Sequence, residues 1–184
     1  MPKIVDHDEM RDAIAKRCID AFALRGYGSI SMRTLAEAAN TSTGTLYHYF
    51  GSKAVLFRHV VTTVAAHDIA EGSRLLVQAF AKPEDRLLPL LQFVALQMSR
   101  LATHFRVLAE FSIHPDNPGN AWLELMTESR KRYLGALRET LETDDDAKVD
   151  LVLLTICGLV LRSMCGDPTT ELGPVVAQLK KVMR

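Results

Sequence analysis

Residues 31–53 carry groups whose types and spacing suit contact with a nucleic acid. Hydroxyl groups of Ser, Thr and Tyr can donate hydrogen bonds to phosphate oxygens, and Thr methyls and Tyr rings can contact thymine methyls. A Lys can neutralise a phosphate, and an Arg can bond a guanine edge through two parallel hydrogen bonds. This combination predicts binding to duplex DNA. The candidate residues are Arg33, Ser42, Thr43, Gly44, Thr45, Tyr47, Tyr49 and Lys53.

Two short helices joined by a turn are predicted to position these groups. Ser31 is a favourable N-cap for a helix over 32–39, and Ser42 is one for a helix over 43–49. Asn40-Thr41 supplies the turn, so the segment is predicted to be a helix-turn-helix unit. The two helices are expected to pack through small and apolar residues, namely Leu35, Ala36, Ala39, Leu46 and Phe50.

Three residues of the second helix allow a structural interpretation beside the functional one. Gly44 is unfavourable in an isolated helix, so its backbone is expected to lie close to another surface, either DNA or a neighbouring helix. Tyr49 is interpreted either as a phosphate contact or as a partly buried core residue. His48 is expected to be exposed to solvent with no further role.

The segment resembles the DNA-binding region of the TetR family of transcriptional regulators. One departure is Asn40-Thr41, where the family commonly has Gly-Val; Asn tolerates the left-handed conformation that Gly supplies, so we expect the turn to form. Thr41 places a hydroxyl where the family has a methyl group. The matching residues keep a fixed spacing and are Phe22, Gly26, Tyr27, Ser31, Met32, Arg33, Thr34, Leu35, Ala36, Ala39, Ser42, Thr43, Gly44, Thr45, Leu46, Tyr47, His48, Tyr49, Phe50, Ser52, Lys53 and Leu56.

The resemblance implies a division of the DNA contacts and a mechanism. Base edges would be contacted by Arg33, Thr43, Gly44, Thr45 and Tyr47, and phosphates would be held by Ser31, Tyr49 and Lys53. It further implies a repressor that binds a pseudo-palindromic double-stranded operator and is released by a small-molecule effector. A transcriptional activator on the same fold, and a dimeric ligand-binding protein without DNA binding, stay as alternatives.

Helical periodicity extends over almost the whole chain, and no segment alternates as a strand, so we expect an all-α fold of about nine helices. Residues 1–58 are predicted to form the N-terminal three-helix DNA-binding domain, and residues 59–184 the ligand-binding and dimerisation domain. Gly26 should end the first helix, and Pro89 either begins or kinks the fifth. One further helix is expected to follow Asp144-Asp145-Asp146 and to end near Cys165. The others are expected over 8–25, 53–80, 83–103, 104–113, 122–141 and 171–182. The three carboxylates are interpreted as capping groups and not as a metal site.

The eighth predicted helix is apolar on nearly all sides over 149–161. A helix of this type must be covered all round, so we predict a homodimer in which helices eight and nine form a four-helix bundle with their symmetry mates. The alternative is a core formed within one chain.

Aromatic and Met residues of the C-terminal part could line an effector pocket or form ordinary core. Arg106 and Glu110 are interpreted either as a surface ion pair or as a polar anchor in the pocket. Glu110 with His104 and His114 has irregular spacing for a metal site, and we expect no metal. The candidate pocket residues are Phe80, Phe93, Leu96, Met98, Phe105, Leu108, Phe111, Trp122, Met126 and Tyr133.

The composition agrees with a globular protein and gives weak information about partners. The 184 residues are 48% hydrophobic, and 22 basic residues balance 22 acidic ones. The zero net charge argues weakly against DNA, although residues 1–60 hold eight basic and six acidic residues. The sequence shows no nucleophile elbow, phosphate loop or metal signature, so neither an enzyme nor a cofactor is expected. Three cysteines without disulfide spacing are interpreted as buried free thiols in a reducing cytoplasm, and no membrane span is expected.

Overall fold

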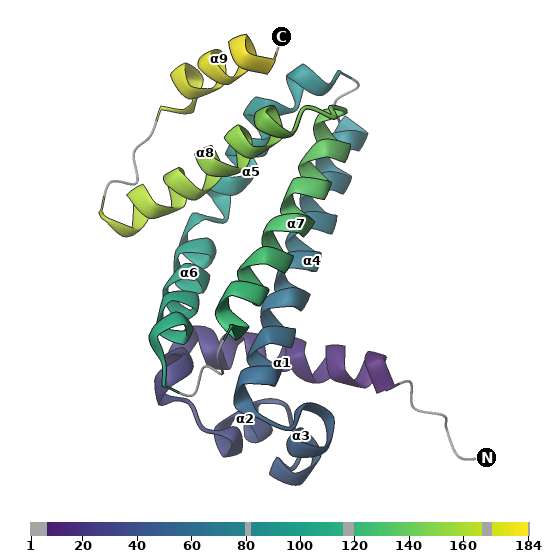
Figure 1. The fold of residues 1–184 in the computed structure, drawn as a ribbon, viewed down its shortest axis with the longest axis vertical. Coiled ribbons are helices and arrows are strands. Elements are labelled where there is room, and N and C mark those ends of the chain that lie inside the picture. The colour runs from purple at the N-terminus through teal and green to yellow at the C-terminus, as the bar shows by residue number, and fades with distance from the viewer. Residues whose placement is uncertain (1–6, 80–81, 116–119, 167–170, 184) are drawn as a thin grey trace, which may run out of the picture. The chain divides into compact units, whose positions relative to one another are not determined.

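The computed structural model describes residues 7–79, 82–115, 120–166 and 171–183. Every regular element in these ranges is helical, which confirms the all-α prediction (Figure 1). The elements are α1 (His7–Ser29), α2 (Met32–Ala38), α3 (Thr43–Phe50), α4 (Lys53–Ala79), the 3₁₀ helix η1 (Pro83–Asp85), α5 (Leu87–Leu96), α6 (Met98–Ile113), α7 (Ala121–Leu141), α8 (Asp146–Met164) and α9 (Leu172–Met183).

Two compact units divide the described residues. The N-terminal unit contains the residues up to Ala66 together with 104–127, and the C-terminal unit contains 67–103 together with 128 onwards. Three helices, α4, α6 and α7, therefore contribute residues to both units. These two units are defined by packing. The predicted boundary between residues 58 and 59 separates a DNA-binding function from a ligand-binding function, and it stays a prediction.

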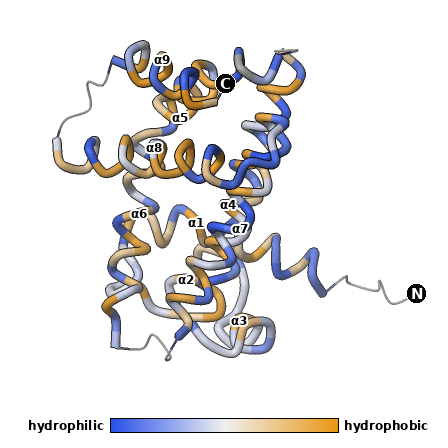
Figure 2. The backbone as a smooth tube through the Cα atoms, turned by 45° about the horizontal axis from the view of Figure 1, so that its top comes forward, coloured by the Kyte–Doolittle hydropathy of each residue, from blue (hydrophilic) through white to orange (hydrophobic). Residues whose placement is uncertain are grey.

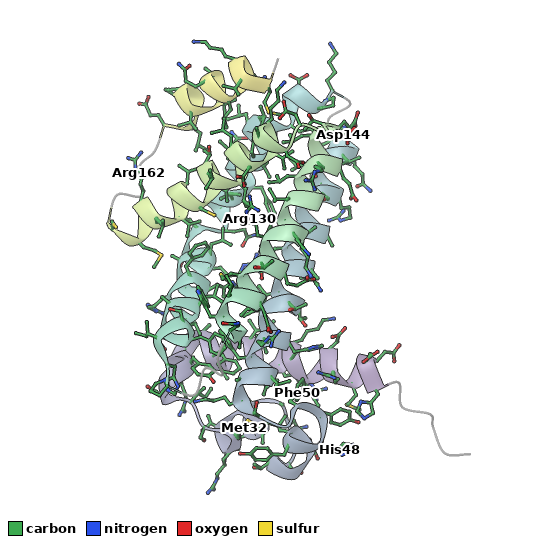
Figure 3. All side chains as sticks on the ribbon, viewed as in Figure 1. Met32, His48, Phe50, Arg130, Asp144 and Arg162 are labelled. Atoms are coloured by element: carbon green, nitrogen blue, oxygen red, sulfur yellow. The ribbon has the colours of Figure 1, made fainter. Side chains whose placement is uncertain are left out.

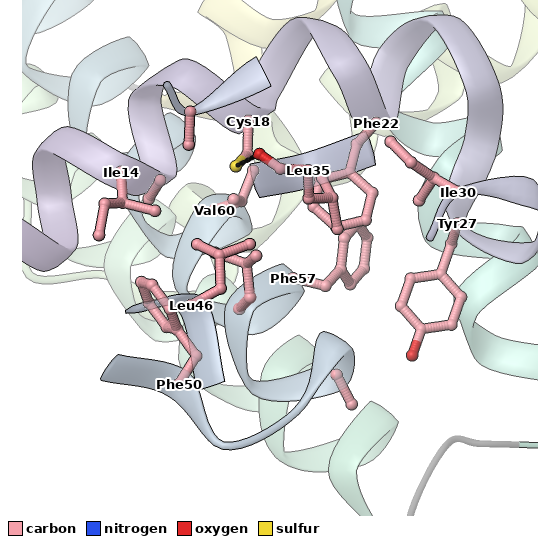
Figure 4. Packing of buried hydrophobic residues seen from close by; sticks show 14 of the residues in the cluster. Ile14, Cys18, Phe22, Tyr27, Ile30, Leu35, Leu46, Phe50, Phe57 and Val60 are labelled. Atoms are coloured by element: carbon pink, nitrogen blue, oxygen red, sulfur yellow. Dashed lines mark hydrogen bonds between the residues drawn. The ribbon is translucent and has the colours of Figure 1, made fainter. Parts of the chain in front are cut away.

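The core of the N-terminal unit joins α1, α2, α3 and α4 to the ends of α6 and α7 that belong to it (Figure 4). Tyr27 is fully buried, and its ring centroid lies 5.1 Å from that of Phe57 and 4.8 Å from that of Phe111. The core therefore fixes the helix-turn-helix unit by packing as well as by local structure. Its largest buried members include Ile14, Cys18, Phe22, Tyr27, Ile30, Leu35, Leu46, Phe50, Leu56, Phe57, Val60 and Phe111.

Gly26 interrupts α1, as predicted, and the chain resumes a last helical turn up to Ser29. Its φ of 75° lies in the left-handed region that favours glycine. A Cβ atom at this position would lie 2.3 Å from Glu110 Oε2, which is far inside van der Waals contact. The backbone conformation therefore favours a glycine here, and a larger residue would also displace the Glu110 carboxylate.

The caps and the turn of the helix-turn-helix unit form as the sequence predicts. Ser31 Oγ accepts a hydrogen bond from the N–H of Thr34 at 3.1 Å, and Ser42 Oγ accepts one from the N–H of Thr45 at 3.0 Å. Asn40 adopts a φ of 52°, the left-handed conformation expected of it in place of glycine. The departure from the family's Gly-Val turn is therefore accommodated.

The prediction of helices over 83–103 and 104–113 is wrong in its boundaries. The break falls at Gln97, which is the C-cap of α5, and α6 already begins at Met98. Pro89 neither begins nor kinks α5, because it is the third residue of that helix, where its missing N–H has no intrahelical partner to lose.

The core of the C-terminal unit contains residues from α4, α5, α7, α8 and α9. Arg86 is 3% exposed and donates hydrogen bonds to the carbonyl of Thr140 at 2.7 Å and to Glu142 Oε1 at 2.8 Å. Asp145 caps α8 by accepting hydrogen bonds from the N–H groups of Ala147 and Lys148, which confirms the capping interpretation of the acidic run.

The cysteines differ in their surroundings. Cys18 is fully buried, and this burial raises the pKa of its thiol to about 11. Burial also raises the pKa of the half-buried Cys157 thiol. Cys165 is exposed, so the prediction of a buried thiol is wrong there, because the residue is the C-cap of α8 and lies beyond its packed turns.

None of the described helices is long and apolar enough to cross a membrane.

Candidate nucleic-acid interface

Two buried side chains anchor α3, and the residues between them include exposed ones. Leu46 is 0% exposed and Phe50 is 4% exposed, and both belong to the core of the N-terminal unit. Between them, Tyr47 is 51% exposed and His48 is exposed, as predicted for His48. Figure 3 shows His48 and Phe50 on different sides of α3. The helix therefore presents Tyr47 to a partner without loss of its own packing.

The hydroxyl groups at the starts of α2 and α3 have structural partners. Ser42 Oγ and Thr45 Oγ1 lie 2.8 Å apart, and Ser31 Oγ and Thr34 Oγ1 lie 3.0 Å apart, each pair in hydrogen-bond contact. Their role in capping is shown, whereas contact with DNA stays a prediction for Ser31, Ser42 and Thr45. An oxygen that already caps a helix is held in one position, which suits a contact of defined geometry.

Gly44 lies in the first turn of α3 with no contact inside the described chain that requires a glycine. A Cβ atom placed there would meet only Ser42 Oγ, at 3.6 Å, an ordinary van der Waals distance. Among the described residues, therefore, no neighbouring helix lies close enough to Gly44 to explain why a glycine occurs there. The exposed backbone beside Thr43 can be approached closely by a second molecule.

Arg33 is a strongly exposed member of the predicted contacts. Its side chain is 86% exposed, and its Nε lies 3.2 Å from Glu37 Oε1, one turn further along α2. An ion pair this exposed contributes little to stability, about 0–1 kcal/mol. The guanidinium can therefore leave Glu37 for a base edge at low cost.

Tyr49 is half-buried, which favours the partly structural interpretation. Its ring centroid lies 4.6 Å from the ring of His7 at the start of α1, and 5.2 Å from that of His48. It also packs against the core of the N-terminal unit. A phosphate contact by Tyr49 stays a prediction.

Lys53 has an internal role that the sequence did not indicate. Its Nζ donates hydrogen bonds to the carbonyls of Tyr27 at 3.0 Å and Ile30 at 3.2 Å. It also lies 4.4 Å from the centroid of the Tyr27 ring, within cation–π range. An ammonium group has three N–H donors, so one is left for a phosphate. Lys53 thus stabilises the turn between α1 and α2 (a bracing role), and a phosphate contact by the same side chain stays a prediction.

Arg17 is a further supporting residue that the sequence analysis missed. Its Nη1 donates a hydrogen bond to the carbonyl of Ala39 at 3.0 Å, which satisfies the C-cap residue of α2 just before the turn. The two residues are 22 positions apart, and no local pattern marks the pair. Its contribution follows only from the fold.

The predicted pocket residues fall into both units. Phe111 is fully buried and, with Trp122 and Met126, packs in or against the core of the N-terminal unit, the unit to which Phe105 also belongs. Phe93, Met98 and Tyr133 belong to the C-terminal unit, and Phe80 lies outside the described residues. A pocket formed by these residues stays a prediction. Leu96, in contrast, is 85% exposed.

Arg106 and Glu110 do not interact as either interpretation requires. Within the described residues, Glu110 Oε2 accepts a hydrogen bond from the N–H of Gly28 at 3.5 Å and lies against Gly26, while Arg106 is exposed. The carboxylate thus supports the end of α1. No group of three potential metal ligands occurs in the part of the chain that the structure describes.

Comparison with known proteins agrees with this geometry. Residues 12–60 match the family model described as bacterial regulatory proteins, tetR family. The HTH-type transcriptional repressor NicS of Pseudomonas putida (strain KT2440) is 25% identical over 160 residues, which cover 86% of this chain and 74% of NicS.

Solved structures share the fold over nearly the whole chain. A protein from Rhodococcus sp. assigned to the TetR-family transcriptional regulators superposes with a TM-score of 0.71 at 18% identity, over 96% of this chain and 97% of the other. The transcriptional regulator FadR from Bacillus subtilis, in complex with stearoyl-CoA, gives a TM-score of 0.64 at 16% identity, over 93% and 96%. Residues 12–60 thus carry the pattern of the tetR family model, and the chain shares the fold of these solved structures.

Proposed function

We propose that this protein represses transcription by binding a pseudo-palindromic DNA operator as a homodimer, and that a small-molecule effector releases it. The observation that carries the proposal is the outward face of α2 and α3. There, Arg33 and Tyr47 are exposed on helices that the buried residues Leu35 and Leu46 hold in place. Exposed polar side chains on a rigid helix-turn-helix unit suit the reading of base edges in the major groove.

The contacts proposed on this face follow from position. The base-reading group is Arg33, Thr43, Gly44, Thr45 and Tyr47, and the phosphate-holding group is Ser31, Tyr49 and Lys53, with Ser42 at the start of α3 between them. Arg33 is free to form two parallel hydrogen bonds with a guanine. Gly44 allows the start of α3 to approach the DNA without a side chain in between.

Dimerisation through α8 and α9 is supported by apolar side chains that a single chain leaves uncovered. Leu154 is 62% exposed, Leu161 is 52% exposed and, on α9, Val182 is 50% exposed. Figure 2 shows hydrophobic residues at intervals along both helices. Pairing of these faces in a four-helix bundle would cover them. A dimer would present two α3 helices, and half-sites about 34–36 Å apart place them in successive major grooves.

Release by an effector requires only that the ligand binds one conformation better than another. A ligand that favours a dimer with different spacing of the α3 helices lowers operator affinity by at most its own differential affinity. Two related proteins support this part of the proposal. NicS is named a repressor, and FadR holds stearoyl-CoA on the same fold.

The test is a selection of duplexes from a random library by the full-length protein, followed by affinity measurement over a range of salt concentrations. We expect a pseudo-palindromic consensus and an affinity that falls steeply as salt rises. Absence of salt-sensitive binding to any duplex would favour the ligand-binding protein without DNA binding. A reporter gene under the selected site separates repression from activation.

A matched pair of variants locates the interface. Arg33→Ala should cost about 1–3 kcal/mol on the selected site and relax one base position. Arg132→Ala is the control, because Arg132 also pairs with a Glu one turn away, with its Nε 2.9 Å from Glu128 Oε1 on α7. Equal losses for the two variants would refute a base contact by Arg33.

A further inference from the structure

The C-terminal unit contains a buried carboxylate whose hydrogen-bonding capacity is unused. Asp68 on α4 is 9% exposed, and neither of its carboxylate oxygens accepts a hydrogen bond from any described residue. A carboxylate can accept about four hydrogen bonds, and burial without them is unfavourable. The burial of Asp68 is therefore not compensated by hydrogen bonds from the described residues.

The charge of Asp68 is balanced although its hydrogen bonds are missing. Arg100 Nη1 lies 2.8 Å from Asp68 Oδ1 and forms an ion pair with it, whereas no described residue donates a hydrogen bond to Asp68 Oδ2. The Nε of Arg100 is instead committed to Gln97 Oε1, at 3.2 Å. His67 Nδ1 is more distant, at 3.8 Å from Oδ1. Asp68 Oδ2 thus lacks a donor among the described residues, although Arg100 balances the charge of the carboxylate.

Two aromatic side chains of the same unit lie near this part of α4. The pKa of the Tyr133 phenol is raised by burial and by the negative charge of Asp68, and Arg100 lowers it, so the phenol lies within electrostatic range of the ion pair. Gly72 is one turn beyond Asp68 on α4, and the ring of Phe93 covers it, with Cε1 3.3 Å from the Cβ position of Gly72. The ring of Phe93 therefore supplies an apolar surface one turn from the carboxylate on α4.

We infer that Asp68 is the polar anchor of an effector site that takes a small, uncharged molecule with an O–H or N–H donor on an aromatic or otherwise apolar body. A neutral donor fits best because Arg100 already balances the charge of Asp68. An ammonium would leave an excess positive charge in a buried place, and an anion would meet the carboxylate. The ligand's donor would supply the hydrogen bond that the protein lacks, and its apolar part would contact Phe93 and Tyr133.

This inference rests on the proposed ligand response, but its test needs no DNA. Phenol, anisole and benzylamine are matched probes with one aromatic ring and a neutral donor, no donor and a cationic donor, respectively. Binding to the full chain is measured by ligand-observed NMR and by the shift in melting temperature. We expect phenol to bind about tenfold more tightly than anisole, the ratio for one hydrogen bond, and more tightly than benzylamine.

Two variants assign this preference to Asp68. Asp68→Leu should abolish the difference between phenol and anisole, and the near-isosteric Asp68→Asn, which keeps one acceptor oxygen and is the safer variant for folding, should reduce it. Equal binding of phenol and anisole to the natural protein, no phenol binding up to its solubility, or an unchanged preference in Asp68→Asn would overturn the inference. Operator affinity of the same preparations is measured separately, so a failure of DNA binding is distinguished from a failure of this site.

Discussion

Replacement of Gly44 by Ala should separate stability from DNA binding. The added Cβ would lie 3.6 Å from Ser42 Oγ and close to no other atom outside its own turn, so no strain is expected. Ala is favoured over Gly inside a helix by about 0.5–1 kcal/mol. The free energy of unfolding should therefore rise by about that amount in denaturant titrations.

DNA affinity should change in the opposite direction. If the backbone at Gly44 lies against the duplex, a methyl group forces the two surfaces apart, at a cost of about 1–3 kcal/mol, as for overpacking in a core. This corresponds to a loss of roughly 5- to 150-fold in affinity, measured by fluorescence anisotropy on the selected operator. Salt dependence should stay the same, because no charge is altered.

Gly135→Ala is the matched control, since a Cβ at that helical position of α7 also meets nothing within 4 Å. It should stabilise the protein to a similar degree and leave operator affinity unchanged. The reasoning is refuted if Gly44→Ala binds the operator as tightly as the natural protein. A fall in stability for Gly44→Ala would show instead that the glycine serves the fold.

Three further changes test the supports of the interface. Lys53→Met should lower the free energy of unfolding by about 2 kcal/mol, because two carbonyls lose a charged donor. It should also flatten the salt slope of DNA binding by about 0.9 if the third donor of Lys53 neutralises a phosphate. An unchanged melting temperature would contradict the bracing role. Gly26→Ala should destabilise by about 1–2 kcal/mol, chiefly through its positive φ, and adding Glu110→Ala should recover little of this loss, as denaturant titrations of both variants can show. Cys18 should make the free energy of unfolding fall as pH rises from 9 towards 11, because its thiol ionises near 9.0 in the unfolded chain but only near 11 in the folded one. Cys18→Ala should remove this component of the pH profile. An identical profile in the variant would contradict the role given to Cys18.

Features that depend on adjacent residues could be predicted from the sequence. Ser31 and Ser42 cap their helices through atoms three residues away, and Asn40 adopts its left-handed conformation through its own side-chain chemistry. The helix-turn-helix unit is built almost wholly from such short-range features. This explains why its boundaries agree with the structure to within about one residue.

Features that depend on packing could not be predicted in this way. The break between α5 and α6 falls at Gln97, where no Gly or Pro marks it, so periodicity alone suggested a single helix up to residue 103. The partner of Glu110 is the N–H of Gly28, 82 positions away, and not Arg106 one turn before it. Lys53 likewise finds its acceptors 23 and 26 positions away. Long-range partners of this kind leave no periodic signal.

The fold explains why residue 26 is a glycine, but it does not explain the glycine at position 44 or the buried aspartate at position 68. Gly26 is explained by its positive φ, so no external partner is needed to account for it. Gly44 has neither reason, yet it weakens the helix that carries the exposed Tyr47. Asp68 is unexplained in the same sense, because a buried carboxylate without hydrogen bonds lowers stability and Arg100 supplies only charge. Natural proteins tend to break such local rules at functional sites. Gly44 lies on the proposed DNA surface, and Asp68 is the proposed polar anchor in the C-terminal unit.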